Sequence, residues 1–276
     1  MIGVFDSGLG GLTILKALIK DLPEYDYVYL GDSARTPYGN KSEDVIFSYA
    51  QEAVDFLFAH GCELIIFACN TASAEALKRI QTEYLPLKYP QKRVLGVLVP
   101  AAEAVDEYYS KNNKKIKHGK KVGIIATWAT VSSGTYEREI KKLDSEIKVF
   151  PYAAPLLVPL VEEGWVKKTE TKRILKTYLR PLKEKKIQVL ILGCTHYPFL
   201  EKQIKAIVGK NIKIINTPKA VAERLKVYLN RHPEIKNKLT TNKKRKFYTT
   251  DNPGRFKQLG EKFLGEKIDK LERIKL

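Results

Sequence analysis

The sequence predicts an α/β protein with two similar domains, each a mainly parallel sheet flanked by helices. Short apolar runs alternate with longer helix-like segments along the chain, which is the pattern of repeated βαβ units. The runs are apolar almost throughout, as in strands that are covered on both faces. Two of them end in similar turns, "LIIFACNTASA" at 64–74 and "VLILGCTHYPF" at 189–199, and this echo favours two comparable halves over one large sheet.

The length and composition fit this architecture. The chain has 276 residues, enough for one large domain or two of ordinary size. It is 44% hydrophobic and 29% charged, which is a globular composition. Its apolar runs are far shorter than the roughly 20 residues of a membrane span, and no signal peptide is recognisable at the N-terminus. We therefore expect a cytoplasmic protein that does not bind a membrane.

Four strands and two helices are expected in the first hundred residues. The strands are the apolar runs "MIGVFDS", "YDYVYLGD", "ELIIFACN" and "RVLGVLVP", at 1–7, 25–32, 63–70 and 93–100. Helices are expected at 11–22 and 42–61. The longer helix has apolar residues spaced along one face, and Gly61 provides its C-terminal stop.

The same alternation continues to the end of the chain. Further strands are expected in the apolar runs "KVGIIAT", "IKVFPYA", "VLILGC", "KIIN" and "RKFYTT". Helices are expected at about 131–143, across 155–185, near 218–230 and near 253–264. The polar, lysine-rich segment 102–121 is the expected crossing point between the two sheets. We expect a first domain of residues 1–98 and 208–276, and a second domain of residues 99–207.

The net charge of +18 raises the question of a nucleic-acid partner. Most lysines are scattered along presumed solvated helix faces. The densest clusters, at 111–121 and 242–246, fall in expected loops and lack interleaved aromatic residues. We therefore expect no nucleic-acid partner, and the positive field would instead steer a small dianionic substrate toward the protein.

Chemistry is expected in the turns that follow the strands, because ligands of open parallel sheets bind beyond the carboxyl ends of the strands. "DSGLGG" at 6–11 could gather backbone N–H groups around an anion at a helix N-terminus. Equally, Asp6 or Ser7 could merely cap that helix. In "GDSARTPYGN", Tyr38 and the Gly39 amide could hold a carboxylate, although ordinary turn chemistry also explains the composition.

Three cysteines are too few for a disulfide framework. Cys62, in "HGCEL", comes before a strand and lacks polar companions of the kind that follow Cys69 and Cys194, so it is interpreted as structural. Cys69 and Cys194 are each expected at a strand-to-helix junction, where the helix N-terminus would lower the thiol pKa. Asn70, Thr71 and Thr195 would offer donors to a carboxylate, and His196 could exchange a proton with a thiol or with the substrate.

Three chemistries could use these residues. A zinc site could take Cys69, Cys194 and His196, but the close paired spacing of structural zinc sites is missing. A cysteine hydrolase with His196 as the base would use one cysteine and leave the other unexplained. In a racemase or epimerase, one thiolate would remove a proton from a carbon while the other thiol delivers one to the opposite face. Only this last chemistry needs two similar cysteine turns.

The motifs "FDSGLGG", "GDSARTPYG", "ACNTAS", "TWATVSSGTY", "PLVEEGW" and "GCTHYP", in this order, resemble the cofactor-independent glutamate racemases of the aspartate/glutamate racemase family. The resemblance runs from residue 2 to about 200 and continues more loosely through "YTTDNPGRF". It implies an active site in the cleft between the two domains. It also implies interconversion of L- and D-glutamate without a cofactor, the D form serving peptidoglycan synthesis.

By motif, Cys69 and Cys194 would be the two catalytic acid/bases. The family pattern would have Cys69 take the proton from D-glutamate and Cys194 take it from L-glutamate. Asp6 would support Cys69, and His196 would support Cys194. No metal ligand is implied.

The resemblance also implies further site residues. Glu162 in "PLVEEG" matches an acidic residue on the Cys194 side, but the adjacent Glu163 leaves two candidates for that position. The substrate-binding residues implied by motif are Asp6, Ser7, Pro37, Tyr38, Gly39, Asn70, Thr71, Thr130, Thr195 and His196.

The family resemblance implies a homodimer, in one of more than one arrangement. Some members carry an N-terminal extension tied to activation by a cell-wall precursor. Here the first strand is expected to start at residue 2, so such control is not expected. Two alternatives remain. One is an aspartate-type racemase, which tends to have an acidic residue where His196 follows "GCT". The other is a binding protein for nucleic acid or an acidic partner.

Overall fold

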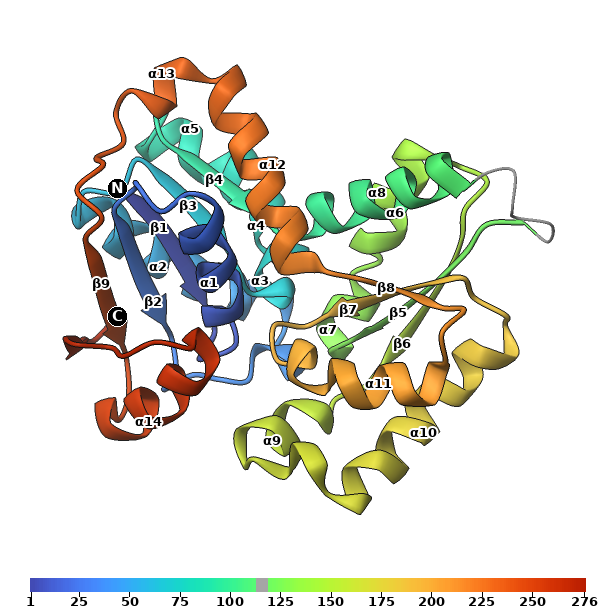
Figure 1. Cartoon of the computed structure of the whole chain (residues 1–276). Coiled ribbons are helices and arrows are strands. Elements are labelled where there is room, and N and C mark those ends of the chain that lie inside the picture. The colour runs from blue at the N-terminus through green and yellow to red at the C-terminus, as the bar shows by residue number, and fades with distance from the viewer. Residues whose placement is uncertain (113–118) are drawn as a thin grey trace.

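The computed structural model describes residues 1–112 and 119–276. Within these ranges the chain forms two units, each built on a sheet with helices packed against it, and both marked termini lie on the first unit (Figure 1). The predicted α/β class, with two sheet-and-helix domains, is confirmed.

The first sheet has six strands in the order β10-β9-β2-β1-β3-β4. All of its pairings are parallel. Every residue of the three central strands β1, β2 and β3 is buried, as expected for strands covered on both faces. The strands are β1 Ile2–Asp6, β2 Tyr27–Gly31, β3 Leu64–Phe67, β4 Arg93–Gly96, β9 Arg245–Thr249 and β10 Leu271–Arg273.

The second sheet has four parallel strands in the order β6-β5-β7-β8. They are β5 Lys121–Ala126, β6 Lys148–Ala153, β7 Val189–Gly193 and β8 Lys213–Ile215. The prediction that residues from 208 onward return to the first domain is wrong for β8. This strand pairs with β7, and its Ile214 and Ile215 are buried in the hydrophobic core.

Helices cover both sheets (Figure 1). Those around the first sheet are α1 Leu12–Asp21, α2 Glu43–Ala59, α3 Asn70–Glu75, α4 Leu77–Arg79, α5 Leu85–Lys88, α12 Thr217–Arg231, α13 Pro233–Lys236 and α14 Pro253–Leu264. Those around the second are α6 Leu98–Asn112, α7 Trp128–Ser132, α8 Thr135–Leu143, α9 Leu157–Glu162, α10 Thr169–Glu184 and α11 Glu201–Val208. Single turns complete the list: η1 Tyr38–Asn40, η2 Ile80–Tyr84, η4 Trp165–Lys167 and η5 Tyr197–Leu200.

Three elements differ from the sequence-based expectation. The strand expected at 93–100 ends at Gly96, and α6 begins at Leu98, because Pro100 fits the first turn of a helix, where its missing N–H needs no acceptor. The helix expected at 131–143 is split into α7 and α8 by Gly134, whose φ of 63° is left-handed. Strand β10 was not predicted, since its sequence "LER" is short and mostly charged.

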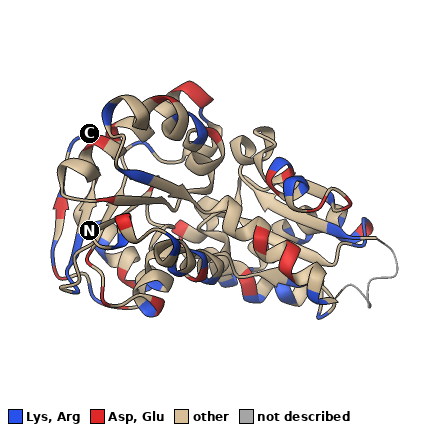
Figure 2. Ribbon diagram, turned by 90° about the horizontal axis from the view of Figure 1, so that it is seen from above, with Lys and Arg blue, Asp and Glu red and all other residues tan. Residues whose placement is uncertain are grey.

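The structure describes the two lysine clusters, at 111–121 and 242–246, to different extents. Most of the cluster at 111–121 lies outside the described residues. The cluster at 242–246 leads into β9, and the Lys244 backbone N–H donates to Asp26 Oδ1 at 2.7 Å. Elsewhere basic and acidic positions are interspersed along the helices (Figure 2). Among the described residues, no helix is both long and apolar enough to cross a membrane.

The carboxyl ends of the central strands bring the motif residues together. Asp6 ends β1, and Cys69 follows β3 in the first unit. Thr127 follows β5, and Cys194 follows β7 in the second unit. Since parallel strands share one carboxyl edge, each sheet presents its polar turns on a single side, and those two sides meet.

Candidate active site

Cys69 stands where β3 gives way to α3. Its sulfur accepts the N–H of Ala72 at 3.4 Å and donates to Ser7 Oγ at 3.4 Å. The residue is the N-cap of α3, as predicted from the strand-to-helix pattern, and only 5% of its surface is exposed. The first cysteine is therefore held in place by a helix start and by the turn that follows β1.

Cys194 follows β7, but no α-helix starts there. The chain passes through the single turn η5 before α11 begins at Glu201. The prediction of a helix N-terminus beside this thiol is therefore wrong. Its polar partner is His196, whose Nδ1 lies 3.8 Å from the Cys194 sulfur.

Asp6 is fully buried between the two units. Its Oδ2 accepts the Gly8 N–H at 3.0 Å, and its Oδ1 accepts the Thr195 hydroxyl at 3.4 Å. The helix that follows has Gly11 as its N-cap with no side-chain cap, so neither Asp6 nor Ser7 caps it. The carboxylate therefore links the turn after β1 to the turn after β7.

The glycines of "DSGLGG" permit close packing across this junction. A Cβ on Gly10 would lie 2.2 Å from Thr195 Oγ1 and 2.7 Å from His196 Nδ1. Gly39 is similar, since its Cβ would lie 2.6 Å from Thr127 Cβ. The anion-gathering role expected for the glycine turn is not what these contacts indicate. The glycines instead leave room for residues of the second unit.

Hydroxyl groups join the two units near Cys69. Thr71 Oγ1 lies 2.9 Å from Thr127 Oγ1 and 3.2 Å from Thr130 Oγ1, and the two second-unit hydroxyls are themselves 2.9 Å apart. The Tyr136 hydroxyl donates to Asn70 Oδ1 at 2.8 Å. This bond fixes the orientation of the Asn70 amide and leaves its nitrogen to donate.

The loop after β2 contains three of the predicted substrate-binding residues, Pro37, Tyr38 and Gly39. Tyr38 is buried, and its hydroxyl donates to Asp32. Pro37 is exposed, and it follows a cis peptide bond. Gly39 packs directly on Thr127 of the second unit.

Glu162 and Glu163 have different environments, which separates the two candidates that the sequence left open. Glu162 Oε1 lies 3.0 Å from His196 Nε2, and the imidazole is buried. Glu163 lies on the surface and accepts from Arg255 Nη2 of the first unit at 2.9 Å. The acid that contacts the cysteine–histidine pair is therefore Glu162.

Burial controls the protonation of Cys69. It raises the pKa of the Cys69 thiol to about 12, and the nearby charge of Asp6 adds to this rise. The predicted lowering by the helix N-terminus is wrong here, because the hydrogen bonds that Cys69 makes with Ser7 and Ala72 do not offset the loss of water around the thiolate. Burial likewise raises the pKa of Asp6.

His196 is driven toward its charged form. Burial opposes a charge on the imidazole, but the hydrogen bonds and charges of Cys194 and Glu162 outweigh it and raise the pKa of His196 to about 10. The contact between Glu162 and His196 has the opposite effect on the pKa of Glu162. Burial favours its neutral form, yet the hydrogen bond and charge of His196 lower its pKa overall. The geometry is thus a carboxylate–imidazolium–thiol relay.

A cavity of about 130 Å³ opens beside this relay at the junction of the units. Its lining includes Gly8 and Thr36 from the turns of the first unit, Arg255 from α14 and Glu162 from α9. The described residues contain no group of three His, Cys, Asp or Glu side chains placed to hold a metal ion. The cavity lining reaches the cysteine–histidine pair through Glu162, which contacts His196.

Sequence reasoning did not single out three residues that contribute to this region. Tyr136 and Thr127 lie in or next to the quoted motif "TWATVSSGTY", and Arg255 lies in "YTTDNPGRF". The signal that could have found Thr127 is its position directly after an expected strand. Tyr136 and Arg255 lie within helices, and only the packing of the units reveals their contacts.

Known proteins resemble this chain in sequence and in fold. Residues 13–225 match the family model described as Asp/Glu/Hydantoin racemase. A glutamate racemase of Sulfurihydrogenibium sp. is 39% identical over 98% of this chain and 96% of that protein. One of Geobacter metallireducens is 36% identical over 100% of this chain and 96% of that protein.

Among solved structures, glutamate racemase from Francisella tularensis in complex with D-glutamate superposes with a TM-score of 0.86. The two sequences are 36% identical, and the match covers 99% of this chain and 96% of that one. The similarity thus spans both units and every turn that contributes to the site. The chain belongs to the Asp/Glu/Hydantoin racemase family.

Proposed function

We propose that this protein is a cofactor-independent glutamate racemase in which Cys69 and Cys194 act from opposite sides of the substrate α-carbon. The observation that carries the proposal is the pair of buried cysteines at the carboxyl ends of β3 and β7, one in each sheet. The similarity to glutamate racemases over the full length supports glutamate as the substrate.

In this mechanism one thiolate removes the α-proton of glutamate, and the electron pair of the broken C–H bond delocalises into the α-carboxylate. The thiol on the other side then gives its proton to the opposite face. Each turnover leaves the two sulfurs with exchanged protonation states. Cys69 would take the proton from D-glutamate, and Cys194 would take it from L-glutamate.

Donors around the α-carboxylate must stabilise the charge that develops there. The Asn70 amide nitrogen, left free to donate by Tyr136, and the hydroxyls of Thr71 and Thr195 are suited to this role. Their burial strengthens these interactions, because water no longer screens them. Ser7, Pro37, Tyr38, Gly39 and Thr130 complete the proposed binding region.

The pKa of the Cys69 thiol must fall when the substrate binds. With a pKa of about 12, this thiol is almost wholly protonated at neutral pH. The α-ammonium group of glutamate brings a positive charge among the buried sulfurs and Asp6, and this charge favours the thiolate. On the other side, the imidazolium of His196 stabilises the Cys194 thiolate, with Glu162 holding the imidazolium in place.

We also propose the pathway that uses the product, the compartment of the protein and its oligomeric state. The product D-glutamate would supply peptidoglycan synthesis in the cytoplasm, and the working protein would be a homodimer. The division into domains at 1–98 with the C-terminal residues, and at 99–207, also stays a proposal, amended by the placement of β8.

The direct test is racemisation of L-glutamate by the purified protein without added cofactor, followed by circular dichroism of the amino acid. The signal should decay to zero with wild-type protein and persist with Cys69→Ala or Cys194→Ala. Wild-type activity in either variant would refute the two-base mechanism. Decay with L-aspartate but not with L-glutamate would refute the assigned substrate.

A further inference from the structure

Tyr136, near the start of α8, connects the surroundings of both cysteines. Its hydroxyl donates to Oδ1 of Asn70, the residue after Cys69, at 2.8 Å. Its ring packs on the residue before Cys194, since a Cβ on Gly193 would lie 3.2 Å from Tyr136 Cε2. Both hydrogen-bonded side chains are buried. A residue of the second unit therefore reaches the amide that stands beside the first cysteine.

This hydrogen bond decides which end of the Asn70 amide faces the site. The oxygen and the nitrogen of an amide have nearly the same shape, so their hydrogen-bond partners set the orientation. If the amide were turned around, its nitrogen would donate to the Tyr136 oxygen. The hydroxyl hydrogen would then be buried with no acceptor among the described residues. Because a buried donor without a partner is unfavourable, Oδ1 stays with Tyr136.

The nitrogen of the Asn70 amide remains available. Within residues 1–112 and 119–276 it donates to no protein group, yet it is not one of the buried polar atoms that lack a partner. The nitrogen is therefore not enclosed by protein, and it can donate to a group that enters beside Cys69.

The Tyr136 hydroxyl remains a neutral donor. Burial raises its pKa above the ordinary value for tyrosine, and the charge of the Cys194 thiolate adds to this rise. The hydroxyl therefore keeps its proton at neutral and mildly alkaline pH. The orientation of the Asn70 amide is then independent of pH in this range.

The neighbouring residue Thr135 holds the same short helix, α3, in a different way. Its Oγ1 donates to the Ala74 carbonyl at 3.0 Å, and Arg138 Nη2 donates to the same Oγ1 at 2.7 Å. This contact docks α3 on the second unit but does not involve the Asn70 amide. Thr135 and Tyr136 thus allow the docking of α3 to be separated from the orientation of the amide.

We propose that Tyr136 is a positioning residue for racemisation, which holds the Asn70 amide with its nitrogen toward the α-carboxylate of glutamate. This inference rests on the proposed function, because it requires Asn70 to donate to that carboxylate. Negative charge grows on the carboxylate as the α-proton leaves, so a correctly oriented donor stabilises the transition state more than the bound substrate. Tyr136 acts through Asn70, and it affects kcat more than KM.

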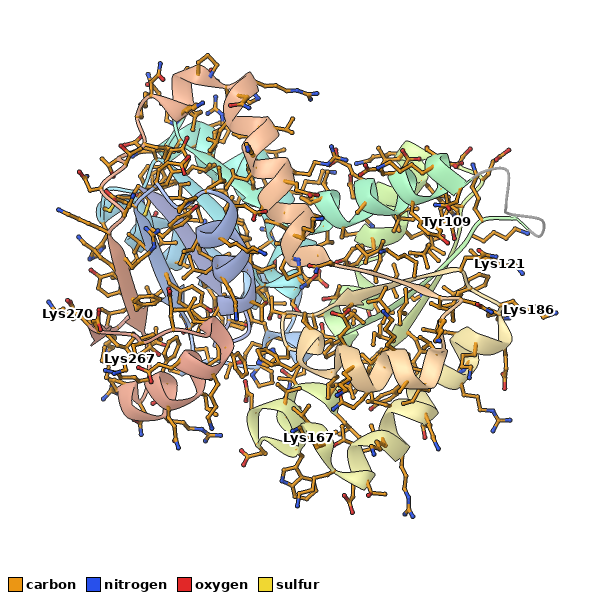
Figure 3. All side chains as sticks on the ribbon, viewed as in Figure 1. Tyr109, Lys121, Lys167, Lys186, Lys267 and Lys270 are labelled. Carbon is orange, nitrogen blue, oxygen red and sulfur yellow. The ribbon has the colours of Figure 1, made fainter. Side chains whose placement is uncertain are left out.

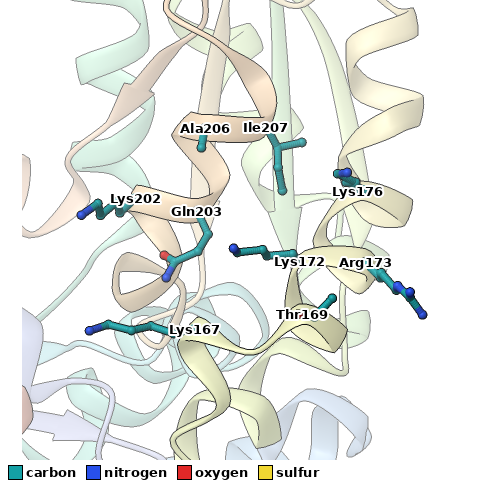
Figure 4. A pocket seen from close by; sticks show the side chains of 9 residues that line it. All are labelled: Lys167, Thr169, Lys172, Arg173, Lys176, Lys202, Gln203, Ala206 and Ile207. Carbon is teal, nitrogen blue, oxygen red and sulfur yellow. The ribbon is translucent and has the colours of Figure 1, made fainter.

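The largest described cavity takes no part in this arrangement. It has a volume of about 650 Å³ and lies between α10 and α11, and the residues that line it, labelled in Figure 4, belong neither to α3 and α8 nor to the cysteine turns. The cavity that borders Tyr136 has a volume of only about 30 Å³. Tyr136→Phe removes one oxygen atom and keeps the ring, so it opens no large new cavity there.

The test is steady-state racemisation of both glutamate enantiomers by the full-length protein. Loss of a donor to developing negative charge lowers kcat about a hundred- to thousandfold, and loss of its orientation should have part of that effect. Tyr136→Phe should therefore lower kcat about tenfold and change KM by less than about threefold. The shape of its pH profile should match that of the wild type.

Two outcomes of this test have different meanings. An active wild type with an equally active Tyr136→Phe variant would overturn the positioning role alone. An inactive wild type would refute the proposed function, and this inference with it.

A double-mutant cycle with Asn70→Ala tests whether Tyr136 acts through the amide. Asn70→Ala should itself lower kcat/KM by about a hundredfold or more. Adding Tyr136→Phe to Asn70→Ala should then cause a further loss of no more than about twofold, because the amide that transmits the effect is already absent. Losses that multiply would overturn the positioning role.

Two control variants lose a hydroxyl without affecting the Asn70 amide. Thr135→Val breaks the bond to the Ala74 carbonyl. Tyr109→Phe breaks the bond from a buried tyrosine to the Lys121 carbonyl at 2.7 Å, and Figure 3 shows these two residues at the end of the second unit that points away from the first. Both controls should keep kcat within about threefold of the wild type.

The controls also give results that would contradict the proposal. A loss in Thr135→Val equal to that in Tyr136→Phe would assign the effect to the docking of α3. An equal loss in Tyr109→Phe would assign it to the stability of the second unit. Either result would overturn the role of Tyr136 in orienting the amide.

Discussion

Glu162 and Glu163 are adjacent at the end of α9, yet only one of them reaches the buried relay. Glu162 contacts the His196 imidazole, and Glu163 pairs with Arg255 on the surface. Sequence alone left both as candidates, because neighbouring residues at the end of a short helix can point either way. The packing of the two units decides between them.

Glu162→Gln should change the pH dependence of racemisation. Losing the carboxylate charge lowers the pKa of His196, which Cys194 and Glu162 together raise to about 10 in the wild type. The imidazolium that supports the Cys194 thiolate is lost as pH rises through this pKa. The alkaline limb of the kcat/KM profile should therefore move to lower pH by about one unit or more.

Glu163→Gln is the matched control for this change. It removes the same charge one residue away but leaves the imidazole contact intact. Its profile should overlay that of the wild type. An unshifted profile for Glu162→Gln, or equal shifts in both variants, would contradict the relay.

At the scale of elements, the turn between β1 and α1 decides how closely the two units meet. Gly10→Ala would place a methyl group 2.2 Å from Thr195 Oγ1. The turns after β1 and β7 would then have to separate. A misplacement on the order of 1 Å can reduce a rate about a hundredfold, so kcat/KM should fall by about that factor while the far-UV circular dichroism spectrum stays native.

Gly8→Ala tests whether this effect is specific. Its Cβ would meet Thr36 Oγ1 at 3.5 Å, an ordinary contact. It should lose far less activity than Gly10→Ala, measured under the same conditions. Similar losses in both variants would mean that the turn needs glycine for its backbone, not for the approach of Thr195.

The elements that could be predicted are those whose signal is local. The buried strands β1, β3 and β7 are continuous apolar runs, and the turns after them carry the polar residues. The charged strand β10 depends on tertiary packing. The start of α6 at Pro100 and the break between α7 and α8 at Gly134 have local causes, but a proline or a glycine is also compatible with the elements that we expected there. The raised pKa of Cys69 could not be predicted either, because it depends on how completely the folded chain excludes water from the thiol.

At the scale of the whole molecule, an ion pair joins the two units beside the cavity near the active site. Arg255 on α14 and Glu163 after α9 are 61% and 64% exposed as side chains. Exposed pairs contribute only about 0–1 kcal/mol to stability. Arg255 also lines the cavity next to Glu162, where we expect an anionic substrate to enter.

Arg255→Ala should therefore affect substrate capture more than stability. We expect KM for glutamate to rise about three- to tenfold with little change in kcat, because the positive charge at the opening is lost. The free energy of unfolding should change by less than about 1 kcal/mol.

Lys257→Ala is the control, since Lys257 is an exposed cation on the same helix that does not line the cavity. Its KM should stay near the wild-type value. A large loss of stability without a change in KM for Arg255→Ala would indicate that the residue only holds the units together.

The central claim is that two different sulfurs handle the proton on the two faces of the α-carbon. The most direct measurement is the early time course of racemisation of L-glutamate in deuterium oxide, followed by mass spectrometry of the separated enantiomers. Two bases predict deuterium in the D-glutamate formed, with the remaining L-glutamate unlabelled at low conversion. Equal early labelling of both enantiomers would contradict the account of two bases that keep their protons during turnover, because a single base would return deuterium to either face.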